Sequence, residues 1–187
     1  MYRRNVDRGI WSEADGEGAL RAHAAGLRVS THVETAQDFR HALDAAVDEI
    51  NHLPGFRGDE ENRFPSAELF RLTEEDAERA AESGVVVVTT LGSLDEFGDA
   101  ETVERARETF RWNLSLLNDR GVRLALGSDA YGSVGVDQAM QVLELGVFSN
   151  LELLKLWVEE TPRAIFPHRK LGRDILESRG SAPDGWR

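Results

Sequence analysis

The chain has 187 residues, 41% of them hydrophobic, and contains no cysteine. This length suffices for one globular domain with an apolar core, and the lack of cysteine excludes disulfide bonds and thiolate metal sites. An excess of 34 acidic over 22 basic residues gives a net charge of −12, which argues against nucleic-acid binding. No apolar run approaches the roughly 20 residues that cross a bilayer, so we expect a soluble, cytoplasmic protein.

The first half of the chain predicts two units in which a helix precedes a short strand. A helix ends at Gly26, a residue typical of helix ends, and a β-branched run over 27–32 follows it. Thr35 and Asp38 have the spacing of a capping box, with Asp in place of the usual Glu, and predict the start of the next helix. The second strand is expected over 48–52.

A third unit begins with another capping box, formed by Thr73 and Asp76. Its helix is expected to end at Gly84, directly before a valine-rich run over 85–91. Continuous valine in a strand indicates burial on both faces of the sheet.

The fourth unit consists of an amphipathic helix over 99–120 and a strand over 122–129. After it, the pattern predicts only helices, at about 136–145, 150–159 and 162–166. Four repeats of helix and strand predict an α/β fold with parallel strands. We expect this domain to span 1–170 and to be followed by an irregular tail over 171–187.

Two loops stand out by their length, 53–71 after the second strand and 92–98 after the third. Both would lie on the carboxyl side of the strands. Long loops in compact domains tend to be binding segments or lids, so this side of the sheet is the expected functional side.

Three potential metal ligands fall at the carboxyl ends of the expected strands: His32, His52 and Asp129. In parallel α/β folds these strand ends converge on one rim, where ligands and catalytic groups collect. One such histidine is more often structural, but two on consecutive strands with an aspartate favour a divalent metal. Zinc is the expected ion, with manganese, iron or cobalt as alternatives, and its chemistry is amide or ester hydrolysis.

The other three histidines are weaker candidates for a functional site. His23 and His41 fall within helical patterns, and His168 lies beyond the last strand among charged residues. We expect all three to have structural or solvent-exposed roles.

Four segments together resemble the amidohydrolase superfamily, in particular its imidazolonepropionase-like and Xaa-Pro-dipeptidase-like branch. They are 29–35 (VSTHVET), 48–55 (DEINHLPG), 124–129 (LALGSD) and 161–166 (TPRAIF). The first three resemble strands five, six and eight of the family's TIM-like (β/α)8 barrel, and the last resembles the helix after the catalytic domain. The resemblance therefore implies the C-terminal half of such a barrel.

The family's functional residues map onto these positions. The resemblance implies that His32 and His52 bind metal, and that Asp129 binds metal and takes a proton from the attacking water. Thr89 and Thr90, at the end of the third run, would face a small-molecule substrate. The implied activity is hydrolysis of a carbon–nitrogen bond in an amide, a cyclic amide or a dipeptide.

The sequence departs from the family pattern in its metal ligands. It has no His-x-His pair, and its two lysines, Lys155 and Lys170, both follow Asp129, so neither can be the carboxylated lysine of strand four. Ala46 also occupies a position where the family has glycine, which would cost about 1 kcal/mol at positive φ. We expect strands one to four to be absent and 174–187 to be unrelated to the family.

The resemblance supplies only part of the family's metal ligands, so the sequence also permits an interpretation other than a hydrolase. The alternative is a non-catalytic half-barrel or interaction module that pairs with another chain, including a second copy, through exposed sheet edges. A phosphate-binding α/β fold is a third possibility, but no glycine-rich phosphate loop supports it.

Overall fold

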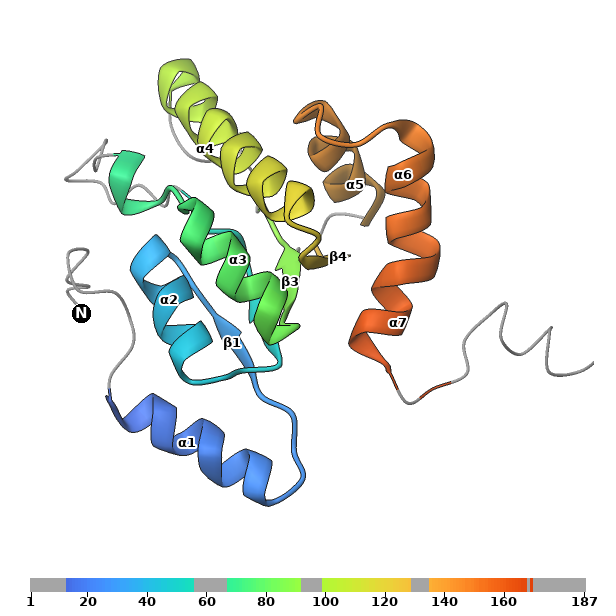
Figure 1. Ribbon diagram of the computed structural model, residues 1–187. Helices are drawn as coiled ribbons and strands as arrows, with labels where there is room; N and C mark the ends of the chain where they lie inside the picture. Colours follow the sequence, from blue (N-terminus) through green and yellow to red (C-terminus); the bar gives the residue numbers. More distant parts are fainter. Residues whose placement is uncertain (1–12, 56–66, 92–98, 129–134, 168, 170–187) are drawn as a thin grey trace, which may run out of the picture.

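The computed structural model describes residues 13–55, 67–91, 99–128, 135–167 and 169. Four short strands form one parallel sheet in the order β1-β2-β3-β4, which is also their order along the chain (Figure 1). The strands are β1 (Ser30–His32), β2 (Glu49–Asn51), β3 (Val86–Thr89) and β4 (Arg123–Leu126). The predicted fold class is therefore confirmed.

Helices precede the first strand, connect the strands and follow the last one. They are α1 (Glu13–Ala24), α2 (Ala36–Asp44), the 3-10 helix η1 (Ala67–Leu69), α3 (Glu74–Ser83), α4 (Ala100–Asp119), α5 (Gly135–Glu144), α6 (Asn150–Lys155), the π-helix η3 (Leu156–Glu160) and α7 (Thr161–Ile165). Within the described ranges, none of these helices is long and apolar enough to cross a membrane.

Local sequence signals start and end the helices as expected. Thr35 and Thr73 form complete capping boxes with Asp38 and Asp76, so that two orphan N–H groups at each helix start are satisfied. Gly84 ends α3 with φ of 69°, a left-handed conformation that glycine adopts without steric cost.

The π-helix η3 departs from the regular helix expected over 150–159. Pro162 follows closely, and a proline cannot donate a backbone hydrogen bond to the preceding turn. The N–H of Thr161 donates to the carbonyl of Leu156, five residues back, which is the bond of a π-turn. The proline thus explains why the helix widens here.

Most of the apolar core lies on the face of the sheet that α2, α3 and α4 cover. Its fully buried members include Phe39, Ile50, Val87, Leu114 and Leu117. All four residues of β3 are buried, which confirms the burial on both faces predicted from its valines.

The opposite face of the sheet is covered much less. On β3 and β4 it presents Val86, Val88 and Ala125, which pack against Ala164 and Ile165 of α7. On β1 and β2 it presents polar side chains, with the hydroxyl of Ser30 donating to Glu49 at 2.9 Å. We call this the inner face, because it is the face that a barrel would enclose.

Helix α7 contacts residues in or beside both edge strands of the sheet, β4 and β1. The N–H of Leu126, in β4, donates to the hydroxyl of Thr161 at 2.8 Å rather than to another strand. The guanidinium of Arg28, just before β1, donates to the carbonyl of Ile165 at 3.0 Å. Helix α7 therefore covers part of the outer edge of β4 as well as the inner face.

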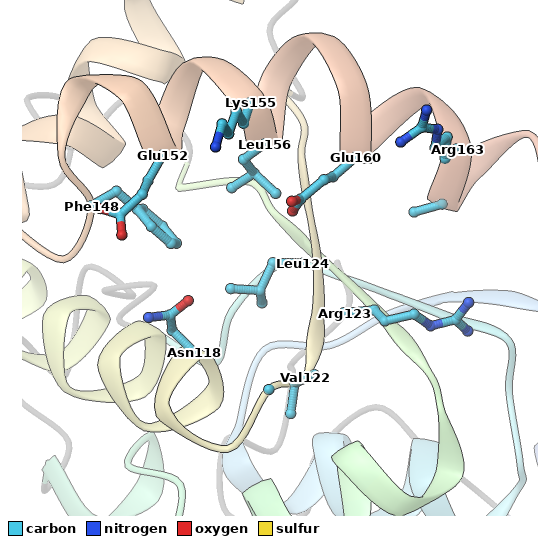
Figure 2. A pocket seen from close by; sticks show the side chains of 12 residues that line it. Asn118, Val122, Arg123, Leu124, Phe148, Glu152, Lys155, Leu156, Glu160 and Arg163 are labelled. Atoms are coloured by element: carbon cyan, nitrogen blue, oxygen red, sulfur yellow. The ribbon is translucent and has the colours of Figure 1, made fainter. Parts of the chain in front are cut away.

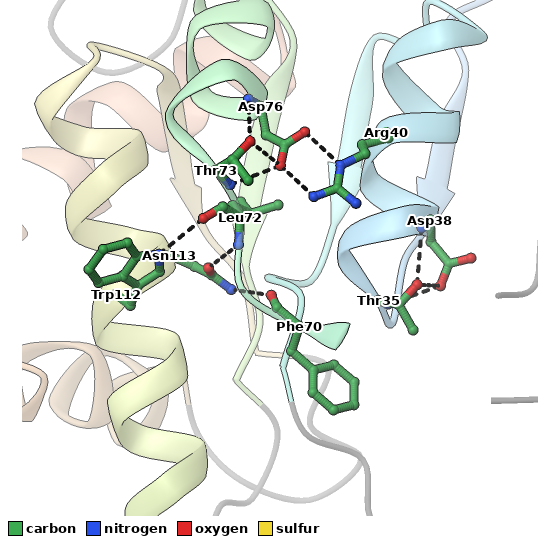
Figure 3. Close-up of polar contacts among 9 residues, drawn as sticks. All are labelled: Thr35, Asp38, Arg40, Phe70, Leu72, Thr73, Asp76, Trp112 and Asn113. Atoms are coloured by element: carbon green, nitrogen blue, oxygen red, sulfur yellow. Dashed lines mark hydrogen bonds and ion pairs between the residues drawn. The ribbon is translucent and has the colours of Figure 1, made fainter. Parts of the chain in front are cut away.

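An ion pair joins α2 to α3 on the helix-covered side (Figure 3). The Arg40 guanidinium donates to both carboxylate oxygens of Asp76, at 2.9 and 2.8 Å. Burial by itself raises the pKa of Asp76, but Arg40 and the Thr73 cap hold it below its ordinary value. One carboxylate thus both caps α3 and fixes it to α2.

Candidate functional site

The structure brings His32 and His52 together at the carboxyl end of the sheet. His32 is the last residue of β1, and His52 directly follows β2. Their ring centroids lie 4.4 Å apart and the rings are inclined by 70°, so the edge of one meets the face of the other. Convergence of these two residues on one rim was expected from their positions at neighbouring strand ends.

Hydrogen bonds fix which nitrogen of each ring carries a proton. Nδ1 of His52 lies 3.2 Å from the carbonyl oxygen of Thr90, and Nε2 of His32 lies 3.4 Å from a carboxylate oxygen of Glu34. Both partners can only accept, so these nitrogens are the donors. In the neutral rings the lone pairs are therefore on Nε2 of His52 and Nδ1 of His32.

Glu34 is a site residue that the sequence analysis missed. Its side chain is only 17% exposed and contacts the ring of His32. A signal for it existed, because residues two apart in an extended segment point to the same face. Carboxylates that hold the second nitrogen of a metal-binding histidine are common in metal sites, and they fix the orientation of the ring.

The backbone at His52 has an unusual conformation. Its φ is +75°, in the left-handed region that residues with a side chain rarely occupy. Its N–H donates to the carbonyl of Val88 at 3.1 Å, which anchors it to β3. Such conformations cost free energy and are concentrated at functional sites.

Gly127 allows the end of β4 to approach β3 closely. A Cβ atom at this position would lie 2.6 Å from Cγ1 of Val88 and 2.8 Å from Cγ2 of Thr90. Real Cβ atoms do not approach that closely, so a larger residue here would push the rim apart.

The two predicted substrate residues are both buried. Thr89 is 0% and Thr90 is 7% exposed, and within the described residues their hydroxyl oxygens have no hydrogen-bond partner. The side chain of Thr89 alternates onto the face of Val87, whereas that of Thr90 lies near Gly127. Contact of these residues with a substrate stays a prediction.

The third predicted ligand, Asp129, lies outside the described residues, as do His168 and the tail 171–187. In the part of the chain that is described, no group of three or more His, Asp or Glu side chains is arranged to hold a metal ion. The described donors are two imidazoles, the donor type that zinc and its neighbours in the periodic table prefer. These residues fit such a metal as part of a ligand set.

The other two described histidines have structural partners. Nε2 of His23 lies 3.0 Å from Asp48, which also accepts from the N–H of Val29 at 2.7 Å. Nε2 of His41 lies 2.8 Å from Gln37, one turn earlier in α2. His23 thus ties α1 to the residue before β2, whereas the contact of His41 stays within α2.

A cavity of about 590 Å³ lies near the amino end of β4 (Figure 2). Leu124 and Leu156 line its apolar part, and Lys155, Glu160 and Arg163 surround them. The rim with the two histidines lies at the opposite end of the strands, so this cavity is separate from the candidate site.

No family model and no curated protein matches the chain. Solved structures do match it, among them an amidohydrolase with a TM-score of 0.61, at 21% identity over 88% of this chain and 39% of that one. A prolidase in complex with N-methylphosphonate-L-proline has a TM-score of 0.61 at 24% identity, covering 87% and 39%. A Xaa-Pro dipeptidase with methionine in its active site has a TM-score of 0.61 at 19% identity, covering 88% and 40%.

These likenesses show the fold. The chain spans about 40% of the length of the matched structures. Its four parallel strands and the helices between them correspond to part of a TIM barrel, as the motifs at His32, His52 and β4 predicted. The chain therefore has the fold of the C-terminal half of an amidohydrolase barrel.

Proposed function

We propose that His32 and His52 belong to the divalent-metal site of a hydrolase that acts on carbon–nitrogen bonds of small molecules. The observation that carries this proposal is the contact of the two rings at the ends of β1 and β2. The names of the structural neighbours, an amidohydrolase, a prolidase and a Xaa-Pro dipeptidase, support the class of bond.

Each described residue has a distinct part in this proposal. His32 would hold the ion through Nδ1 and His52 through Nε2, because their other nitrogens donate to Glu34 and Thr90. A bound zinc ion, or manganese, iron or cobalt in its place, lowers the pKa of water and polarises a carbonyl group. Asp129 would complete the ligand set and accept a proton from the attacking water.

Metal content of purified protein tests the site. After loading with zinc and removal of the excess, wild type should retain zinc, measured by mass spectrometry, and His52→Ala should lose most of it. His41→Ala is the matched control, since this histidine lies in α2 and is held by Gln37. Equal zinc in wild type and His52→Ala would refute the assignment, and an equal loss in His41→Ala would place the site elsewhere.

Hydrolysis is tested separately from metal binding. Zinc-loaded protein is assayed with Xaa-Pro dipeptides and with a cyclic amide, and released amine is measured. We expect His52→Ala and Asp129→Asn to abolish any hydrolysis seen in wild type. Zinc binding without hydrolysis would keep the metal site and refute catalysis by this chain on these substrates.

Pairing with another chain is a second candidate function, favoured by the position of β1. Within the described residues this strand has β2 on one side and no strand on the other. Ser30→Pro removes a backbone donor from β1, and proline disrupts strand pairing. If copies pair through this edge, light scattering will show a wild-type dimer and a Ser30→Pro monomer. A wild-type monomer at all concentrations would refute pairing between copies.

A further inference from the structure

A buried asparagine in α4 joins the two ends of the segment that follows the candidate site. Asn113 is 0% exposed, and its side-chain amide donates to the carbonyls of Pro54 at 2.6 Å and Phe70 at 3.0 Å. Figure 3 shows the bond to Phe70. Its side-chain oxygen accepts from the N–H of Leu72 at 2.9 Å. Both amide hydrogens and the oxygen are thus used, which leaves this side chain in one orientation.

The hydrogen-bond partners of Asn113 come from two separate parts of the chain. Pro54 lies two residues after His52, whereas Phe70 and Leu72 directly precede the Thr73 cap of α3. One side chain therefore fixes the exit from β2 and the entrance to α3 at the same time. The indole N–H of Trp112 adds a further bond, but only to the α3 end, through the carbonyl of Leu72 at 3.0 Å.

Helix α4 also restrains the next residue, Gly55. A Cβ atom at Gly55 would overlap the ring of Phe110, so the backbone is in direct contact with α4. The N–H of Gly55 donates to the carbonyl of Glu34 at 3.3 Å, which joins this segment to the residue that orients His32. Helix α4 thus contacts the rim through 54–55.

The conformation of His52 explains why holding residues 54 and 55 matters for the candidate site. A non-glycine residue at φ of +75° relaxes unless its surroundings hold it on both sides. On one side the N–H of His52 bonds to the carbonyl of Val88, and on the other Asn113 holds Pro54. We propose that Asn113 is a positioning residue, which fixes the backbone after His52 and thereby the position of its ring against His32.

The proposal deepens the proposed function, since it gives the metal-site ring a second support. It also makes a prediction that needs no metal. The rings of His32 and His52 are 4.4 Å apart, so each shifts the NMR signals of the other by its ring current. A movement of His52 therefore shows in the imidazole signals of both residues.

Asn113→Ser tests the proposal, because it removes both amide donors and keeps a small polar side chain. Trp112→Phe is the matched control, because it removes one bond to the α3 end and leaves Pro54 held. With signals assigned from His32→Gln and His52→Gln, we expect Asn113→Ser to shift both histidine signals and Trp112→Phe to leave them in place. In zinc titrations we expect Asn113→Ser to bind about 10- to 100-fold more weakly than wild type.

Unchanged histidine signals in a folded but less stable Asn113→Ser would overturn the proposal, since the residue would then be only structural. If Asn113→Ser does not fold, Gly55→Ala tests the same segment with Asn113 intact, and it should shift the same two signals. Unchanged signals in folded Gly55→Ala would also overturn the proposal. If wild type binds no zinc, the proposed metal site is refuted, but the positioning role of Asn113 is not. The NMR signals of His32 and His52 still test that role.

Discussion

On one face of the sheet, side chains from α2, α3 and α4 build a core around Ile50 and Val87, whereas on the other face, among the residues that the structure describes, Ala164 and Ile165 of α7 pack against Val86, Val88 and Ala125. The second face continues into a polar region on β1 and β2 and ends at the two histidines. The apolar core and the candidate site therefore lie mostly on opposite faces of the sheet. The helix-covered face holds the chain together, and the inner face and its rim carry the candidate site.

The largest effect that distinguishes the two faces is expected from truncating apolar side chains. Leu114→Ala, in the fully buried core, should lower the free energy of unfolding by about 2 to 5 kcal/mol. Ile165→Ala, on the half-buried helix of the inner face, should cost about 1 to 2 kcal/mol. Urea denaturation measures both, and equal losses would mean that the inner face stabilises the fold as much as the core does.

Polar contacts on the helix-covered side should rank next. Asp76→Ala removes the N3 half of the α3 capping box and leaves Arg40 without this partner, at a cost of about 3 kcal/mol. The control is Asp44→Ala, which breaks the exposed ion pair with Arg79 and should cost at most about 1 kcal/mol. A loss for Asp76→Ala as small as that of the control would show that α2 and α3 are not joined by this carboxylate.

Two neighbouring alanines before β2 offer a smaller test with opposite signs. Ala46 has φ of +53°, the left-handed conformation, while Ala45 has φ of −77°. Ala46→Gly should therefore stabilise the protein by up to about 1 kcal/mol, and Ala45→Gly should destabilise it by a similar amount. Thermal melts of the two variants measure the difference, and a change of the same sign in both would contradict it.

The smallest effect concerns pH and the contact between α1 and the sheet. Burial raises the pKa of Asp48, but the N–H of Val29 and the ring of His23 lower it by more, so it lies below the ordinary 3.8. The stabilisation by this carboxylate is therefore complete above that value and is lost as pH falls through the lower, folded pKa. Asp48→Asn should lose less stability than wild type between about pH 5 and pH 2. Identical acid profiles would mean that Asp48 does not contribute.

Local signals made most of the fold predictable from the sequence. The capping boxes at Thr35 and Thr73 and the glycine at 84 act within one helical turn, so they can be recognised without knowing the fold. The strands were placed correctly but are shorter than expected. The π-turn before Pro162 was not predicted. The proline is visible in the sequence, but the sequence does not show that the N–H of Thr161 bonds to the carbonyl of Leu156.

The candidate site was predictable where it depends on strand ends. His32 and His52 were found because the ends of neighbouring parallel strands meet. Asn113 could not be found, because its partners lie 41 to 59 residues away and a polar residue in a helix is usually exposed. The left-handed conformation of His52 was also missed, since nothing in a single sequence marks a strained histidine.

The strand order of the sheet follows the order of the chain, and this has a consequence for synthesis. Each of β2, β3 and β4 pairs with the strand made just before it, so its partner has already left the ribosome when it emerges. The sheet can therefore grow by one strand at a time, with each new helix closing a short loop rather than a distant one. We expect arrested nascent chains of increasing length to show protease protection of β1 and β2 before protection of β4.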